Sequence, residues 1–292
     1  MMTTYHSVSV KGLEVFYREA GPKHAPTIVL LHGFPSSSHM FRELIPRLAQ
    51  HFHVIAPDLV GFGHSAHPTT KDFNYTFDSL ASVVEELLLR TLNLKKFSIY
   101  VQDYGAPVGF RVASRNPQVI DAIIVQNGNA YLEGLSPAWE PLRALWTART
   151  PETEKQVRAL LRAETTKLQY THGVKDLQKI SPDSYTFDQL FLDRPGNDAV
   201  QLELFSNYAS NLALYSDWQA YFRKHQPPML IVWGINDPFF TVEGAKAYQR
   251  DLPKAALHLL DTGHFALEEE GVFIAERIRE FLGRATGRAA SH

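Results

Sequence analysis

Three side chains have the types, and the order along the chain, that hydrolysis through a covalent ester requires. Asp103 lies in "QDYGAP", Asp237 in "GINDPFF" and His264 in "DTGHFALEE". A carboxylate such as that of Asp103 can attack an electrophilic sp³ carbon that carries a leaving group, which leaves an alkyl ester on the protein. His264 can then activate the water that hydrolyses the ester, while Asp237 orients the imidazole and stabilises the imidazolium.

Each of these residues also has a purely structural interpretation. Asp103 can cap the helix that follows it, Asp237 can form a turn before Pro238, and His264 is one of 13 histidines. The order nucleophile, acid, histidine, with each residue at the carboxyl end of a predicted strand, favours the catalytic interpretation.

Two backbone N–H groups are expected to complete this chemistry. Ester hydrolysis passes through a tetrahedral intermediate whose oxyanion needs hydrogen-bond donors. The sharp turn after Asp103 needs small residues, and Gly105 supplies one. We expect the N–H of Tyr104 in this turn and the N–H of Phe34 in "HGFP" to form the oxyanion hole. His32 is expected to brace the "HGFP" loop.

The rest of the sequence predicts the elements that place these groups together. Buried strands are predicted where short apolar runs precede turns, at residues 27–33, 53–58, 97–102, 121–127, 229–234 and 256–261. Amphipathic helices, including those at 77–94 and 106–115, alternate with these strands. This alternation is typical of an α/β fold, a mostly parallel sheet flanked by helices. Such a sheet collects reacting groups at the carboxyl ends of its strands.

The alternation of strands and helices stops in the middle of the chain. Helix-forming and aromatic residues prevail there, and no buried strand is predicted. We interpret residues 129–226 as a helical cap that is inserted into a core made of residues 1–128 and 227–292. Such a cap would exclude water from the reacting groups and define the substrate pocket.

The composition argues against several other classes of protein. The 292 residues carry a net charge of −2 and no basic face, which disfavours nucleic acid and membranes as partners. The sequence has no cysteine, no apolar run long enough to span a membrane and no signal-peptide pattern, so we expect a cytoplasmic protein. We expect no cofactor and no metal, a small apolar electrophile and water as partners, and a monomer or homodimer.

The motifs together resemble a known family. "HGFP", "DLVGFGHS", the elbow centred on Asp103, "WGINDPF" and "DTGHFALEE" resemble the α/β-hydrolase superfamily, in particular its epoxide hydrolase and haloalkane dehalogenase branch. The resemblance implies Asp103 as nucleophile, Asp237 as acid and His264 as base. In some relatives the acid follows the preceding core strand, but here that region carries Asn127 and Asn129, which cannot act as carboxylates.

The two branches differ in the group that leaves the substrate carbon. An opened epoxide needs a proton, which the resemblance assigns to a cap tyrosine, Tyr215 or Tyr208 by position. A halide needs only N–H donors, and the dehalogenases carry a tryptophan where this chain has Tyr104. Trp139 and Trp146 stand in the early cap and are expected to line the pocket.

We therefore expect an α/β-hydrolase with an Asp nucleophile, most simply one that converts a small epoxide to a vicinal diol. Two alternatives remain open at this point. The first is a haloalkane dehalogenase that releases halide and an alcohol. The second is a small-molecule receptor that uses the same fold without turnover, because a fold alone does not establish a function.

Overall fold

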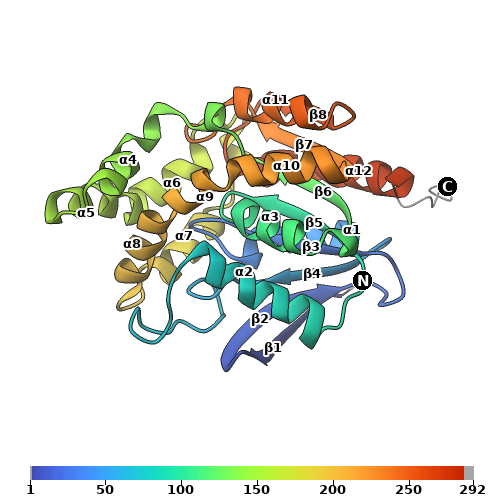
Figure 1. The fold of residues 1–292 in the computed structure, drawn as a ribbon, viewed down its shortest axis with the longest axis horizontal. Coiled ribbons are helices and arrows are strands. Elements are labelled where there is room, and N and C mark those ends of the chain that lie inside the picture. The colour runs from blue at the N-terminus through green and yellow to red at the C-terminus, as the bar shows by residue number, and fades with distance from the viewer. Residues whose placement is uncertain (1, 286–292) are drawn as a thin grey trace.

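The computed structural model describes residues 2–285, which form one eight-stranded sheet with helices around it. The strands lie in the order β1-β2-β4-β3-β5-β6-β7-β8, and Figure 1 shows them from its lower edge upward. Their bounds are β1 (Thr4–Val10), β2 (Leu13–Ala20), β3 (Thr27–Leu31), β4 (His53–Pro57), β5 (Phe97–Gln102), β6 (Ile120–Gln126), β7 (Met229–Gly234) and β8 (Ala256–Leu260).

The sheet is parallel except at one edge. β1 pairs antiparallel with β2, and β2 pairs antiparallel with β4. The other neighbouring strands all pair in parallel, so the carboxyl ends of β3 to β8 meet along one edge. The prediction of an α/β fold with a mostly parallel sheet is confirmed.

Helices cover both faces of the sheet. One layer contains α2, α3 and α11, and the opposite layer contains α1 and α12. The bounds are α1 (Leu44–Leu48), α2 (Phe77–Glu86), α3 (Gly105–Arg115), α11 (Val242–Asp251) and α12 (Ala266–Ala285). The predicted helix at 77–94 is interrupted, because α2 gives way to a π-helical turn at Leu87–Thr91. The spacing of apolar residues does not reveal such a local change in hydrogen bonding.

Alternate side chains of the central strands enter the two cores that these layers create. In β3, Val29 and Leu31 pack in the core on the α2 and α3 side, whereas Ile28 and Leu30 pack in the core on the α1 and α12 side. Burial on both faces explains why the strand sequence is a continuous apolar run. Each fully buried aliphatic side chain contributes about 1.5–3 kcal/mol, so the central strands are a rigid base for the loops at their ends.

The turn between β5 and α3 is an elbow with Asp103 at its tip. Asp103 has a φ of 48°, in the left-handed region that few residues other than glycine adopt. α3 begins at Gly105, where an added Cβ would lie only 2.1 Å from the backbone oxygen of Leu31. Glycine at this position therefore permits the close approach of α3 to β3, which aims the Asp103 side chain away from the sheet.

The chain between β6 and β7 is helical, and we call residues 129–226 the helical insertion. Apart from a single bridge between Leu135 and Phe240, none of its residues pairs as a strand, and all of them are described. Its α-helices are α4 (Glu140–Thr147), α5 (Pro151–Arg158), α6 (Ala163–Thr171), α7 (Pro182–Leu192), α8 (Asn197–Asn207), α9 (Ala209–Ala213) and α10 (Tyr215–His225). α4 to α8 form the left part of the molecule in Figure 1. The division of the chain at residues 128 and 226 stays a prediction.

None of the helices within residues 2–285 combines the length and the apolar character that crossing a membrane requires.

Candidate active site

Asp103, Asp237 and His264 come from three different segments and meet at the carboxyl edge of the sheet. Asp103 follows β5, Asp237 follows β7 and His264 lies between β8 and α12. Nδ1 of His264 donates a hydrogen bond to Oδ2 of Asp237 over 2.7 Å. Nε2 of His264 lies 4.0 Å from Oδ2 of Asp103. The imidazole thus stands between the two carboxylates, with one ring nitrogen toward each.

The carboxylate of Asp237 is held by four hydrogen bonds. Its Oδ1 accepts from the backbone N–H groups of Phe239 and Phe240, over 2.7 and 3.2 Å. Its Oδ2 accepts from His264 and from Nδ2 of Asn127, each over 2.7 Å. A buried charge needs such partners, and a carboxylate fixed in this way orients the imidazole.

Asn127 connects three of the loops that form the site. Besides its bond to Asp237, its side chain accepts from the N–H of Gly234 over 2.9 Å, and its backbone oxygen accepts from the N–H of Asp103 over 3.2 Å. From the sequence, Asn127 is predicted only to be unable to serve as the acid. The structure shows that Asn127 positions the acid, Asp237. Its place directly after a core strand is the one feature of the sequence that points to this role.

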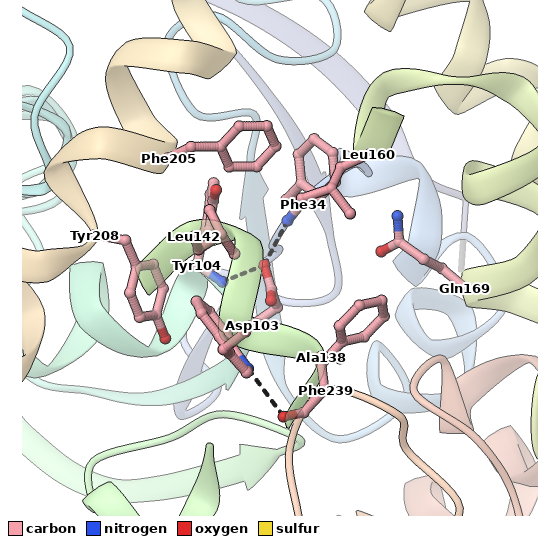
Figure 2. Close-up of a pocket in the computed structure, with 11 residues that line it drawn as sticks. Phe34, Asp103, Tyr104, Ala138, Leu142, Leu160, Gln169, Phe205, Tyr208 and Phe239 are labelled. Atoms are coloured by element: carbon pink, nitrogen blue, oxygen red, sulfur yellow. Dashed lines mark hydrogen bonds between the residues drawn. The ribbon is translucent and has the colours of Figure 1, made fainter. Parts of the chain in front are cut away.

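The two predicted oxyanion donors point at Asp103 itself. The backbone N–H groups of Phe34 and Tyr104 donate to its Oδ1 over 2.7 and 2.6 Å, as the dashed lines in Figure 2 show. Oδ1 is therefore held, while Oδ2 remains on the side of His264. In an ester formed through Oδ2, the same two donors would face the carbonyl oxygen that becomes the oxyanion.

Burial and the neighbouring charges together set the charge state of the site. Burial raises the pKa of Asp103 from 3.8 to about 6, against the opposing effects of His264 and of the two backbone donors. Burial by itself lowers the pKa of His264, but the neighbouring Asp237 and Asp103 carboxylates outweigh it, so the pKa of His264 is raised. An ionised Asp103 is less stable here than in water, which makes its carboxylate a more reactive nucleophile.

Gln102 is a further contact of the imidazole that the sequence reading missed. Its side-chain amide is fully buried, and its Nε2 donates to Nε2 of His264 over 2.8 Å. Gln126 in the neighbouring strand donates to the backbone oxygen of His264 over 2.7 Å. Both residues are the last of their strands, so the sheet edge itself holds the loop that carries the histidine. A glutamine at a strand end gives no sequence signal that distinguishes such a contact.

A largely apolar cavity opens above Asp103, between the core and the helical insertion. The cavity volume is about 40 Å³, which is room for a few water molecules, so the site is narrow as it stands. Its walls, drawn in Figure 2, are mostly aromatic and aliphatic. The lining residues are Phe34, Asp103, Tyr104, Ala138, Trp139, Leu142, Leu160, Gln169, Phe205, Tyr208 and Phe239.

The two predicted pocket tryptophans occupy different positions. Trp139 lines the cavity, but its indole N–H donates to the backbone oxygen of Phe239 over 2.9 Å. Trp146 is not brought to the cavity wall, because it stacks on the outer side of Tyr208 and donates to the backbone oxygen of Phe205 over 2.8 Å. Neither indole N–H is therefore directed at Asp103.

The two candidate proton donors also differ. Tyr208 lines the cavity, and burial together with its neighbours Tyr215 and Asp103 raises the pKa of its hydroxyl well above the ordinary value. Tyr215 is buried behind Tyr208, where its hydroxyl accepts from Nδ2 of Asn129 over 3.2 Å. Of the two tyrosines, only Tyr208 is a cavity wall residue.

The other motifs have structural partners. His32 is fully buried; its Nε2 accepts from the N–H of Leu59 over 3.0 Å, which braces the "HGFP" loop as expected. Gly61 and Gly63 adopt positive φ values of 89° and 49° in the turn that "DLVGFGHS" forms. Within residues 2–285, no group of three or more His, Cys, Asp or Glu side chains is placed to hold a metal ion.

Comparisons with known proteins place these features in a family. The sequence profile of the alpha/beta hydrolase fold family matches residues 26–271. An uncharacterized hydrolase of Saccharomyces cerevisiae is 44% identical over 95% of this chain and 97% of its own length. A haloalkane dehalogenase of Mycobacterium marinum is 30% identical over 91% of this chain and 88% of its own.

A solved structure supports the same fold. The crystal structure of haloalkane dehalogenase DbeA from Bradyrhizobium elkani superimposes with a TM-score of 0.81, at 21% identity, over 99% of this chain and 100% of that one.

The raised pKa of Asp103 predicts a specific pH dependence of stability. Because the folded-state pKa of about 6 exceeds the ordinary 3.8, this carboxyl favours folding below about pH 4 and progressively less as the pH rises to about 6. The variant Asp103→Asn lacks this titration. Between about pH 4 and pH 7, we therefore expect the free energy of unfolding of the variant to rise by roughly 1–3 kcal/mol relative to that of the wild type.

Denaturant unfolding of both proteins across this pH range measures the difference. Asp217→Asn, at an exposed position of α10, serves as the control for the loss of one carboxylate. A free energy of unfolding of Asp103→Asn that, relative to that of the wild type, stays constant or falls as the pH rises would contradict the assignment.

Proposed function

This chain belongs to the alpha/beta hydrolase fold family, and we propose that it is a hydrolase that opens a small epoxide to a vicinal diol through an ester on Asp103. The proposal rests above all on the placement of Asp103. Its Oδ1 is held by two backbone donors, and its Oδ2 is left between the cavity and the imidazole of His264. One oxygen is thus restrained and the other is available to a bound electrophile.

In the first step, Oδ2 of Asp103 attacks an epoxide carbon and the bond from that carbon to the ring oxygen breaks. The alkoxide that forms takes the hydroxyl proton of Tyr208, which stands on the cavity wall. The raised pKa of Tyr208 keeps the phenol protonated at neutral pH and makes it a weak acid, so it gives up its proton only to a strong base such as an alkoxide. The products of this step are a hydroxyalkyl ester on Asp103 and a tyrosinate.

In the second step, Nε2 of His264 exchanges its hydrogen bond with Gln102 for one with water and takes a proton from that water, and the hydroxide adds to the ester carbonyl carbon. The negative charge on the former Oδ1 is stabilised by the N–H groups of Phe34 and Tyr104. Asp237 stabilises the imidazolium through Nδ1. Collapse of the intermediate expels the diol oxygen, which receives the proton from His264, and the new acid returns a proton to the Tyr208 oxygen.

The contacts of the tryptophans favour an epoxide over a halide as the reacting group. The indole N–H groups of Trp139 and Trp146 are engaged by backbone carbonyls, and Tyr104 follows the nucleophile where an indole would be useful to a halide. An alkoxide, in contrast, requires a hydroxyl donor, and the lining includes Tyr208, whose hydroxyl is hydrogen-bonded to that of Tyr215. In this reading the helical insertion acts as the cap that supplies the acid and excludes water.

Dehalogenation is the second candidate, because a curated relative at 30% identity is a haloalkane dehalogenase. It would use the same ester and the same histidine, and it would differ only in the departure of a halide without a proton. The receptor alternative is disfavoured, because a receptor has no use for a buried carboxylate with a raised pKa beside a histidine and its orienting acid.

Removal of the base should trap the ester. In His264→Gln, the attack by Asp103 remains possible, but water is no longer deprotonated, so we expect the covalent intermediate to accumulate. Intact-protein mass spectrometry after incubation with an epoxide should show a gain equal to the whole substrate. A haloalkane would instead give a gain equal to the substrate minus hydrogen halide.

The control for this trap is His24→Gln, at an exposed position, which should turn over substrate without an adduct. An adduct that forms with haloalkanes and not with epoxides would replace the first candidate by the second. The absence of an adduct with both compound classes in a folded His264→Gln protein would refute the covalent mechanism.

The tyrosine assignment predicts an unequal effect of two matched substitutions. Tyr208→Phe keeps the ring that packs against Phe77 and Trp139 but removes the acid, so we expect ester formation from an epoxide to slow about 100-fold or more. Tyr215→Phe should slow it much less. Stopped-flow measurement of single turnovers gives the rate of this step. Equal effects of the two substitutions would contradict the role of Tyr208.

A further inference from the structure

One polar side chain stands out in the apolar wall of the cavity. Gln169, on α6 of the helical insertion, is 3% exposed and lines the cavity opposite Tyr208, with Asp103 between them in Figure 2. No hydrogen bond joins its side-chain amide to another group among residues 2–285, and the amide faces the cavity, although an amide can both donate and accept. The other polar side chains of the lining are Asp103, Tyr208, Tyr104 and Trp139, and the indole N–H of Trp139 is bonded to the backbone oxygen of Phe239.

The segment that carries Gln169 is held firmly on both sides. The ring of Tyr170 stacks on Phe265, the neighbour of His264, with ring centres 3.9 Å apart and planes within 4°. The hydroxyl of Tyr170 donates to Asp188 over 2.5 Å, and the hydroxyl of Thr166 donates to Gln189 over 2.7 Å. These contacts tie α6 to α7 and to the loop of the histidine, so the Gln169 amide is presented to the cavity from a rigid helix.

An unpartnered amide in such a place has an energetic consequence for substrate choice. A buried polar group without a hydrogen bond costs about 1–3 kcal/mol, and in the free enzyme water in the cavity can meet this need. A substrate that displaces this water must replace its hydrogen bond. A wholly hydrocarbon chain cannot do so, and sites with a buried polar group reject ligands that leave the group unpaired.

We propose that Gln169 recognises a neutral oxygen in the substrate, so that the preferred substrate is an epoxide whose chain carries an ether, ester or hydroxyl oxygen on the side away from Tyr208. The proposal rests on the proposed function, which it narrows to a substrate class. The amide supplies an N–H to an ether or carbonyl oxygen, and its carbonyl can accept from a hydroxyl. Gln169 is thus a substrate-recognition residue and takes no part in the bond changes.

The charge of the cavity wall limits this oxygen to a neutral group. Asp103 is the one charged side chain among the described residues that line the cavity. A carboxylate or phosphate on the substrate would be buried without a cation and would be repelled by Asp103, at a large cost in free energy. A cationic substrate would compete for the carboxylate that must react.

A series of terminal epoxides tests this inference. One methylene of an alkyl epoxide is replaced by an ether oxygen at successive chain positions, and kcat/KM is measured for each compound and for the parent. In the wild type we expect an optimum position at which the ether is preferred over the parent by about tenfold, the value of one net hydrogen bond. In Gln169→Leu, kcat/KM for the same ether should no longer exceed that for the parent, because the buried ether oxygen then has no hydrogen-bond donor.

Gln156→Leu, at an exposed position of α5 in the same insertion, is the matched control and should keep the wild-type preference. Two results would overturn the inference. The first is a wild-type enzyme for which kcat/KM is higher for the parent alkyl epoxide than for every ether analogue. This result can be obtained without any variant. The other is an ether preference that survives in Gln169→Leu. Both leave the proposed function intact as long as His264→Gln traps an epoxide adduct, so the two failures are distinguishable.

Discussion

The site depends on one constraint, the elbow that holds Asp103 at a φ of 48° with its Oδ1 against the N–H groups of Phe34 and Tyr104. This arrangement requires the β3 and β5 loops to approach closely. A Cβ on Gly33 would lie 2.2 Å from that of Asp103, and one on Gly105 would lie 2.1 Å from the oxygen of Leu31. Two glycines in neighbouring loops thus decide where the carboxylate points, and strain of this kind is common where geometry serves chemistry.

Burial of this carboxylate has a cost that the site offsets only in part. The two backbone donors and His264 stabilise the ionised form, and yet the pKa of Asp103 remains raised to about 6. If hydrogen bonds fully offset the cost of burying the charge, the ionised carboxylate would be more stable and less reactive as a nucleophile. The hydrogen bonds are arranged so that Oδ1 has the donors and Oδ2 does not, which directs the remaining reactivity toward the cavity.

The sequence predicted the fold and the residues at the strand ends because both depend on local patterns. Apolar runs followed by turns located β5 and β7, and the placement of Asp103, Asp237 and His264 after strands followed from them. The remaining features depend on tertiary contacts. Asn127 and Gln102 are ordinary polar residues whose partners lie far along the chain, and Gln169 reaches the cavity only through the packing of α6. Likewise, the positions of the aromatic residues in the sequence do not reveal that Trp146 stacks on Tyr208 and lies outside the cavity wall.

If the ester forms on Asp103, the first diol takes its new oxygen from this carboxylate and not from water. This can be tested by a single turnover in water enriched in ¹⁸O, with enzyme in excess over an epoxide. We expect a diol without ¹⁸O and one ¹⁸O atom in the peptide that contains Asp103, as read by mass spectrometry after digestion. A diol that carries ¹⁸O from the first turnover, with an unlabelled Asp103 peptide, would show direct attack by water and would contradict ester formation on Asp103.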